Sequence, residues 1–292
     1  MEVQKIGGRG ILFNLPSDPF TVQVYCINSP NYLFIIDSGV VMENQLEDVK
    51  KYLEENNLLV KPVIIFNTHG HLDHMGGNEI IDSELIIAHH FSNEEFQATI
   101  DLLKKYDAYK PAIEKIVFPN LTFKERLCFI DEGVEFFYTP GHTKDSASCY
   151  DSIDKILLIG DVLVHPLPSI NWPNLDVFIE TLESLKKIEF NKMILGHEKV
   201  LEDTKFIDET IDYIKRFKEL DVDFAGFTDV HGLMYRWGMV NIAKNLKKGG
   251  KEEEAKEYLL KIKSEIEEPF IKPTDERELQ GIVDEIEKGL KK

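Results

Sequence analysis

The chain has 292 residues, of which 43% are hydrophobic and 29% charged, a balance typical of a globular protein rather than a disordered or fibrous one. Its formal net charge of −18 would repel a phosphate backbone at long range, so nucleic acid is not expected as a partner. Apolar runs such as 63–66 and 156–159 are far shorter than the roughly 20 residues that span a bilayer, so no membrane partner is expected.

The N-terminus and the cysteines both indicate an intracellular protein. Residues 1–5 lack the basic start and apolar stretch of a secretory signal, so we expect a cytoplasmic location. Cys26, Cys128 and Cys149 are odd in number and have no C-x-x-C spacing, which argues against a disulfide scaffold or a thiolate zinc site. We interpret all three as small buried hydrophobic residues.

The first third of the chain predicts a β-meander followed by a helix and a strand. Turn-forming residues at 16–19 and 28–31 separate short β-rich segments. Leu46, Val49 and Leu53 recur at helical spacing among charged residues, which predicts an amphipathic helix. The β-rich segments are 10–15, 21–27 and 32–37, the helix covers 42–56, and an apolar strand follows at 62–67.

Strands and helices alternate from there on, which predicts an α/β protein. Two sheets packed face to face and covered outside by helices, a four-layer αβ/βα sandwich, suit this order of elements. The further strands are expected at 84–88, 127–130, 134–139, 146–150, 155–159 and 192–195, and the helices at 175–188 and 206–220.

Charged amphipathic helices are expected at the C-terminal end of the chain. They cover 234–248, 251–266 and 274–291, with breaks at Gly249-Gly250 and at Pro273. We therefore expect a catalytic domain over residues 1–220 and a helical C-terminal extension over residues 221–292.

A cluster of histidine and aspartate side chains follows the strand at 62–67. Residues 68–77 read Thr-His-Gly-His-Leu-Asp-His-Met-Gly-Gly. Imidazole and carboxylate are ligands that suit zinc, iron or manganese. A single histidine pair in such a loop is more often polar surface, but four ligand-type residues in six positions indicate metal binding. A single tetrahedral zinc would not use all of the candidate side chains, whereas two ions would. The candidates are His69, His71, Asp73 and His74.

Three more ligand-type residues each come just after a predicted strand, with a glycine beside them. They are His142, Asp161 and His197. The neighbouring glycines allow the backbone to approach closely. Each signal is weak alone, but together they complete a set of seven side chains that suits two metal ions.

These residues resemble the metallo-β-lactamase fold superfamily, in order over roughly the first 215 residues, and the Asp37-Ser38-Gly39 turn is similar as well. The resemblance implies the metallo-β-lactamase-like sandwich and a binuclear metal-dependent hydrolase in which a metal-bridging hydroxide attacks the substrate. Two divalent ions are implied, with zinc expected first and iron or manganese as alternatives. By the resemblance, His69, His71 and His142 hold the first ion, Asp73, His74 and His197 hold the second, and Asp161 bridges both.

Catalytic and substrate-contacting residues follow from this arrangement. Asp73 is expected to orient the attacking hydroxide and to relay its proton. The loop 162–172 begins directly after Asp161, so His165 and Trp172 are candidate substrate contacts, although Trp172 could equally anchor the loop on the core. Tyr235-Arg236-Trp237 could form an aromatic and cationic wall, but packing of the first appended helix is the favoured interpretation.

No competing catalytic motif is present. The sequence contains no G-x-S-x-G, P-loop or G-x-G-x-x-G pattern that opens a helix. His89-His90 has no nearby carboxylate, and we interpret it as a surface pair or as histidines at a helix start.

Hydrolysis of a small-molecule ester, thioester or lactone is the function that the sequence favours. Glyoxalase II, the thioesterase of the superfamily, also has a helical C-terminal extension, but its glutathione-contacting basic and aromatic segment has no clear match here. The alternatives are a phosphodiesterase or ribonuclease on the same metals, a persulfide dioxygenase-like oxidoreductase with one iron, and a metal-bearing scaffold without activity. The oligomeric state is left open, and a homo-oligomer is admissible.

Overall fold

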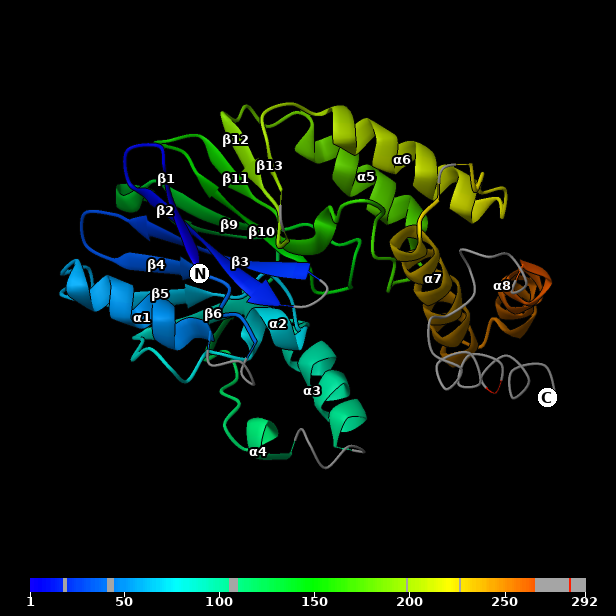
Figure 1. Ribbon diagram of the computed structural model, residues 1–292, viewed down its shortest axis with the longest axis horizontal. Helices are drawn as coiled ribbons and strands as arrows, with labels where there is room; N and C mark the ends of the chain where they lie inside the picture. The colour runs from blue at the N-terminus through cyan, green and yellow to red at the C-terminus, as the bar shows by residue number, and fades with distance from the viewer. Residues whose placement is uncertain are drawn as a thin grey trace. The chain divides into compact units, whose positions relative to one another are not determined.

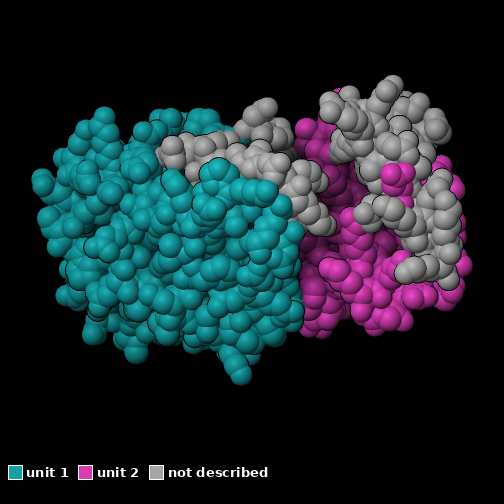
Figure 2. Space-filling model, turned by 90° about the horizontal axis from the view of Figure 1, so that it is seen from below, with its two compact units in different colours: residues 1–140, 144–161, 188–203 teal, residues 141–143, 162–187, 204–292 magenta. Residues whose placement is uncertain are grey.

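The computed structural model describes residues 1–17, 20–40, 45–104, 110–197, 199–225, 227–265 and 284 (Figure 1). By their contacts, residues 1–140, 144–161 and 188–203 form one compact unit, called unit 1 (Figure 2). Residues 141–143, 162–187 and 204–292 form the other, called unit 2. Unit 2 thus takes residues from the middle of the chain as well as its end. The domain boundary expected at residue 220 stays a prediction.

A seven-stranded mixed sheet begins unit 1. Its strands pair in chain order, antiparallel from β1 to β4 and parallel from β4 to β7. The parallel step from β4 to β5 needs a crossover, which helix α1 (Gln45–Glu55) supplies. The strands are β1 Glu2–Ile6, β2 Gly10–Ser17, β3 Phe20–Asn28, β4 Leu33–Ile36, β5 Val63–Phe66, β6 Leu85–His89 and β7 Leu121–Phe123.

A second sheet of six strands completes unit 1, in the order β13-β12-β11-β10-β9-β8. Only the β11–β12 pair is parallel, and the chain between these two strands passes through unit 2. The strands are β8 Arg126–Phe129, β9 Val134–Tyr138, β10 Ala147–Asp151, β11 Ile156–Leu158, β12 Lys192–Ile194 and β13 Val200–Leu201.

The core lies between the two sheets. Alternate residues of both sheets form one buried cluster, in which the Phe66 ring stacks on Phe136 with centroids 4.1 Å apart. Helix α1 lies on the other face of the first sheet (Figure 1). Its Leu46, Val49 and Leu53 pack into a second buried cluster. Strands β4 and β5 are buried on both faces, which explains their unbroken apolar runs. The predicted α/β class with two face-to-face sheets is confirmed.

Several elements differ from the sequence-based expectation. The strands β1, β7 and β13 and the helix α3 (Ser92–Leu103) were not predicted. All three of these strands lie at sheet edges, where one-sided pairing weakens the hydrophobic pattern. The helix expected at 274–291 and the start of the one expected at 42–56 lie outside the described residues. Cys26 and Cys149 are buried as expected, but Cys128 is exposed on β8, so its interpretation as a buried residue is wrong.

Unit 2 combines four helices with irregular segments such as 163–174 in the part of it that is described. Its helices are α5 Leu175–Leu185, α6 Lys205–Lys218, α7 Asp229–Lys248 and α8 Glu252–Glu265. Helix α7 begins five residues earlier than predicted, because Thr228 and His231 form a capping box at its start. Tyr235 of α7 is fully buried and donates a hydrogen bond to Glu265 of α8, as its expected packing role requires. None of the helices in the described ranges is both long and apolar enough to cross a bilayer.

Candidate metal centre

The loop after β5 carries the first four candidate ligands. The strand ends at Phe66, and residues 67–71 lead into the short helix α2 (Leu72–Met75). The side chain of Asn67 donates hydrogen bonds to the carbonyl of His74 and to Asn78, which holds this loop closed on itself. These hydrogen bonds hold the loop as a turn, in which His69 and His74 are buried.

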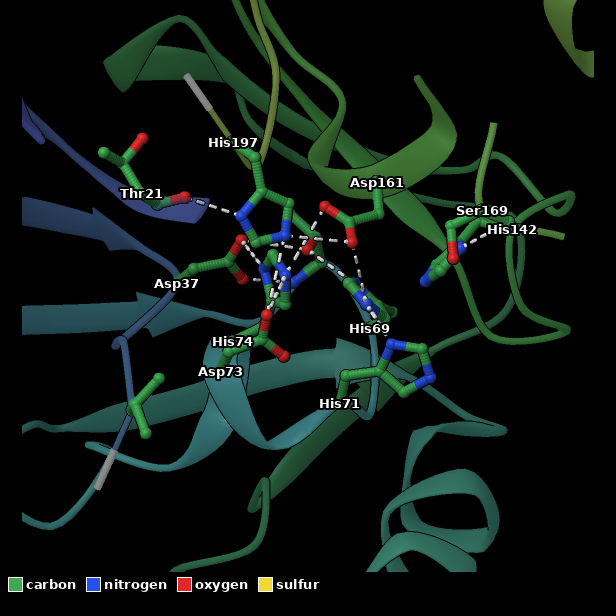
Figure 3. Close-up of polar contacts among 12 residues, drawn as sticks. Thr21, Asp37, His69, His71, Asp73, His74, His142, Asp161, Ser169 and His197 are labelled. Carbon is green, nitrogen blue, oxygen red and sulfur yellow. Dashed lines mark hydrogen bonds and ion pairs between the residues drawn. The ribbon is translucent and has the colours of Figure 1, made fainter. Parts of the chain in front are cut away.

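Candidate ligand atoms gather into two groups in unit 1 (Figure 3). Those of His69, His71 and Asp161 lie within 4.8 Å of one another, and so do those of Asp73, His74 and His197. Asp161 follows β11, and His197 follows β12, the parallel neighbour of β11. The carboxyl ends of strands from both sheets thus supply the two groups.

Asp161 faces both groups. Its Oδ2 lies 3.9 Å from His69 Nε2 in the first group and 3.3 Å from His197 Nε2 in the second. Its Oδ1 lies 3.5 Å from His74 Nε2. The carboxylate thus lies within 3.9 Å of histidines from both groups, which is the position that a bridging ligand requires.

The spacing of these atoms fits a metal better than direct hydrogen bonds. His197 Nε2 lies 3.5 Å from Asp73 Oδ2, and His74 Nε2 lies 3.6 Å from the same atom. Ligand atoms around a tetrahedral zinc, each about 2.0 to 2.1 Å from the ion, are separated by about 3.3 Å. The fully buried His74 Nε2 has no hydrogen-bond partner, which is costly unless another group binds it. The residues present therefore fit a metal ion.

Each histidine in the proposed set, apart from His71, directs its Nδ1 to an oxygen. His74 Nδ1 lies 2.8 Å from Asp37 Oδ2, and His197 Nδ1 lies 2.7 Å from the carbonyl of Thr21. His69 Nδ1 lies 3.1 Å from Thr68 Oγ1. A proton on Nδ1 leaves the Nε2 lone pair available to a metal, so these partners select the ligating tautomer.

Asp37 holds both groups in place, a role that the sequence did not reveal. Its carboxylate accepts hydrogen bonds from the Thr68 amide at 2.8 Å and from Thr68 Oγ1 at 2.9 Å, in addition to the one from His74. Its backbone has φ of 61°, a left-handed conformation that aspartate tolerates better than most residues. The Asp37-Ser38-Gly39 turn was the only sequence signal of this role.

The carboxylates and histidines of the site shift one another's pKa toward the charged forms. Burial alone would raise the pKa of the Asp161 carboxyl, but the adjacent His197 and His74 hold that pKa well below its usual range. Burial likewise opposes protonation of His197, yet Asp161 and then Asp73 raise its pKa to about 9. The carboxylates are therefore ionised at neutral pH, as ligands to a cation must be.

Two glycines make room for these side chains. A Cβ on Gly196 would lie 2.2 Å from Asp161 Oδ1 and 2.8 Å from His74 Cε1. A Cβ on Gly160 would lie 2.5 Å from Thr68 Oγ1, and this glycine has φ of 51°. No other residue could stand at either position without displacing a candidate ligand or the threonine that orients one.

His142 lies in the segment 141–143 between β9 and β10. This segment belongs to unit 2 by its contacts, but its chain neighbours Pro140 and Lys144 both belong to unit 1. His142 is the fourth member of the group that contains His69, His71 and Asp161. The His142 ring is buried, and its Nδ1 lies 2.7 Å from the carbonyl of Ser169 in unit 2 (Figure 3).

The candidate substrate contacts both lie in unit 2. His165 is exposed, and its ring centroid lies 5.7 Å from that of Phe206. Trp172 is half-buried and lines a cavity of about 610 Å³ together with Ile242 and Tyr258. Whether either residue touches a substrate stays a prediction.

His89 differs from its interpretation as a surface residue. It is buried at the end of β6, stacks on Tyr138 with ring centroids 4.0 Å apart, and donates from Nε2 to the carbonyl of Lys124. Burial and then the neighbouring His90 lower its pKa to about 4. His89 is thus a neutral core residue, while the half-buried His90 precedes helix α3.

Comparison with known proteins supports the fold and the family. The family model described as "Metallo-beta-lactamase superfamily" matches residues 17–197, more than half of the chain. A metallo-beta-lactamase family protein from Thermus thermophilus has the same fold, with a TM-score of 0.61 and 16% identity over 82% of this chain and 92% of that one.

Curated relatives share low identity with this chain. A hydroxyacylglutathione hydrolase from Pelagibacter ubique is 25% identical over 63% of this chain and 72% of its own length. A hydroxyacylglutathione hydrolase from Maricaulis maris is 28% identical over 46% of this chain and 48% of its own length, so the match spans about half of that relative. The chain belongs to the metallo-beta-lactamase superfamily, a family of metallohydrolases.

Proposed function

We propose that this protein is a binuclear metal-dependent hydrolase that cleaves a small-molecule acyl thioester. The main support for the proposal is the position of Asp161, whose carboxylate lies within 3.9 Å of histidines from two separate groups of ligand atoms. A site for a single ion would need only one of these groups. The hydroxyacylglutathione hydrolases among its relatives support an acyl group carried on sulfur as the substrate class.

The proposed ligand sets follow the two groups. His69, His71 and His142 would hold the first ion, and Asp73, His74 and His197 the second, with Asp161 shared between them. Zinc is the metal proposed first, because imidazole and carboxylate in a closely spaced set suit it. Divalent ions bound there would make hydroxide available near neutral pH and would polarise an acyl oxygen.

The protein's own residues supply orientation and proton transfer. The Asp73 side chain is about one-third exposed, whereas the histidines of its group are buried, so Asp73 is the member that a substrate and water can reach. We assign it the task of orienting the attacking water and accepting its proton. Asp37 and Thr68 hold the histidine rings so that this geometry exists before substrate arrives.

Metal content and a substrate panel test the proposal. Protein loaded with zinc, iron or manganese is assayed with an acyl-glutathione, an acyl thioester lacking glutathione, a lactone and a phosphodiester, and its metals are counted by elemental analysis. Nearly two metals per chain with thioester cleavage is the expected result. One iron per chain, or cleavage of the phosphodiester alone, would overturn it. His69→Ala protein, purified in parallel, controls for contaminating hydrolases.

A further inference from the structure

Helix α7 of the C-terminal region reaches the segment that carries His142 through a chain of asparagines. Asn241 and Asn245 are four residues apart, so they lie on the same face of α7. Both donate hydrogen bonds to one residue, Asn171, in the loop that precedes α5. All of these residues belong to unit 2, as does His142.

Asn171 is held at both its side chain and its backbone. Asn241 Nδ2 donates to Asn171 Oδ1 at 2.5 Å, and Asn245 Nδ2 donates to the carbonyl of Asn171 at 2.7 Å. Asn241 thus engages Oδ1 of the Asn171 side chain, and the Nδ2 of the same side chain has a different partner. That Nδ2 lies 3.2 Å from Ser169 Oγ.

Asn171 and Ser169 in turn fix His142. The backbone N–H of Asn171 donates to the carbonyl of His142 at 3.1 Å, which holds the histidine backbone. The Ser169 carbonyl accepts from His142 Nδ1 at 2.7 Å, which sets the ring orientation and leaves Nε2 with its lone pair. His142 is thus restrained at two points, and both restraints come from residues 169–171.

We infer that Asn171, Asn241 and Asn245 are positioning residues for His142 as a ligand of the first metal ion, so that helix α7 sets the orientation of this ligand. This inference rests on the proposed role of His142 as a ligand. Hydrogen bonds connect the helix to His142 through Asn171. Residues that orient a metal-bound histidine typically affect metal affinity by about 10- to 100-fold.

Isosteric substitutions remove the two donors without leaving a cavity. Asn241→Asp and Asn245→Asp, separately and together, place a carboxylate oxygen opposite an Asn171 oxygen, so repulsion replaces each hydrogen bond. Lys244→Gln is the matched control, because it lies on the exposed face of the same helix and changes the net charge by the same amount as each single substitution. His142→Ala reports on the ligand role itself.

Metal binding of the intact chain, and not turnover, is the primary measurement. Zinc affinity is determined by competition with a chelator, the cobalt(II)-loaded protein is examined by visible absorption, and the unfolding temperature is measured without metal. We expect the double variant to lose about 10-fold in affinity at one of two sites and to show an altered cobalt spectrum. The unfolding temperature of its metal-free form should match that of Lys244→Gln.

The outcomes separate the two proposals. Wild-type zinc affinity in His142→Ala would remove His142 from the ligand set and end the proposed function as stated. Reduced affinity in His142→Ala, with wild-type affinity and an unchanged cobalt spectrum in the asparagine variants, would overturn only the positioning role. If the double variant does not fold, the single Asn241→Asp variant decides by the same criteria.

Discussion

Asp37 and His74 are joined by a hydrogen bond of 2.8 Å between the carboxylate Oδ2 and Nδ1 of the ring. The same carboxylate accepts from Thr68, whose hydroxyl contacts His69. His74 and His69 belong to different ligand groups. One buried carboxylate therefore orients histidines in both ligand groups, and its removal should weaken the binding of both metal ions.

Asp37→Asn should weaken metal binding while preserving the fold. Asparagine also tolerates the left-handed backbone at this position, but it offers one acceptor oxygen where three hydrogen bonds now converge. We expect zinc affinity to fall by about 10- to 100-fold, measured by chelator competition. Asp82→Asn, at an exposed position, is the control. Equal affinities in the two variants would contradict the orienting role of Asp37.

Asp161→Asn should reduce metal occupancy of the second group and cut turnover. The substitution keeps the shape of the side chain but removes the negative charge shared by the two groups. We expect turnover of any substrate to fall by about 100-fold or more, with fewer than two metals per chain. Elemental analysis measures the metal content and steady-state kinetics the turnover. Asp131→Asn, at an exposed position, is the control. Full metal content with unchanged turnover would remove Asp161 from the mechanism.

Gly196→Ala should disturb the site by a steric clash. The new methyl group would lie 2.2 Å from Asp161 Oδ1, so the carboxylate or the backbone must move. We expect loss of metal and a lower unfolding temperature for the metal-loaded protein, both followed by thermal denaturation with and without zinc. Gly8→Ala serves for comparison, because its nearest neighbour would be 3.4 Å away. Similar behaviour of the two variants would contradict the close packing described for Gly196.

His89 should make stability depend on pH below neutrality. Its pKa is lowered to about 4 in the folded protein from 6.5, so the unfolded chain binds the proton first. The stabilising effect of neutral His89 is complete above about pH 6.5 and is lost as the pH falls toward 4. The full loss is about 3 kcal/mol in the free energy of unfolding.

The matched variant for this test is His89→Gln, which keeps an amide donor for the Lys124 carbonyl but does not titrate in this range. Urea denaturation between pH 7.5 and 4.5 measures the free energy of unfolding of both proteins. The wild type should lose stability more steeply than His89→Gln as the pH falls. If the free energy of unfolding fell equally with pH in the two proteins, His89 would be protonated without cost in the folded state.

Much of the fold could be predicted, because hydrophobic periodicity is local. The strands at 62–67 and 134–139 and the helix at 206–220 were found within a few residues of β5, β9 and α6. The edge strands β1, β7 and β13 escaped prediction, since each pairs on one side only, whereas the edge strand β8 was found. The burial of His89 also escaped, because its stacking on Tyr138 joins residues that are distant in the chain.

The sequence by itself determined the ligand types and their order, from the compact His69–His74 motif to the glycine-flanked Asp161 and His197, because each stands at the end of a recognisable strand. Only the tertiary structure decided that Asp161 faces both ligand groups and that Asp37 orients two histidines. These relations depend on how the two sheets pack, and side chains that are far apart in the sequence meet only after the core has formed. No local pattern encodes such distances.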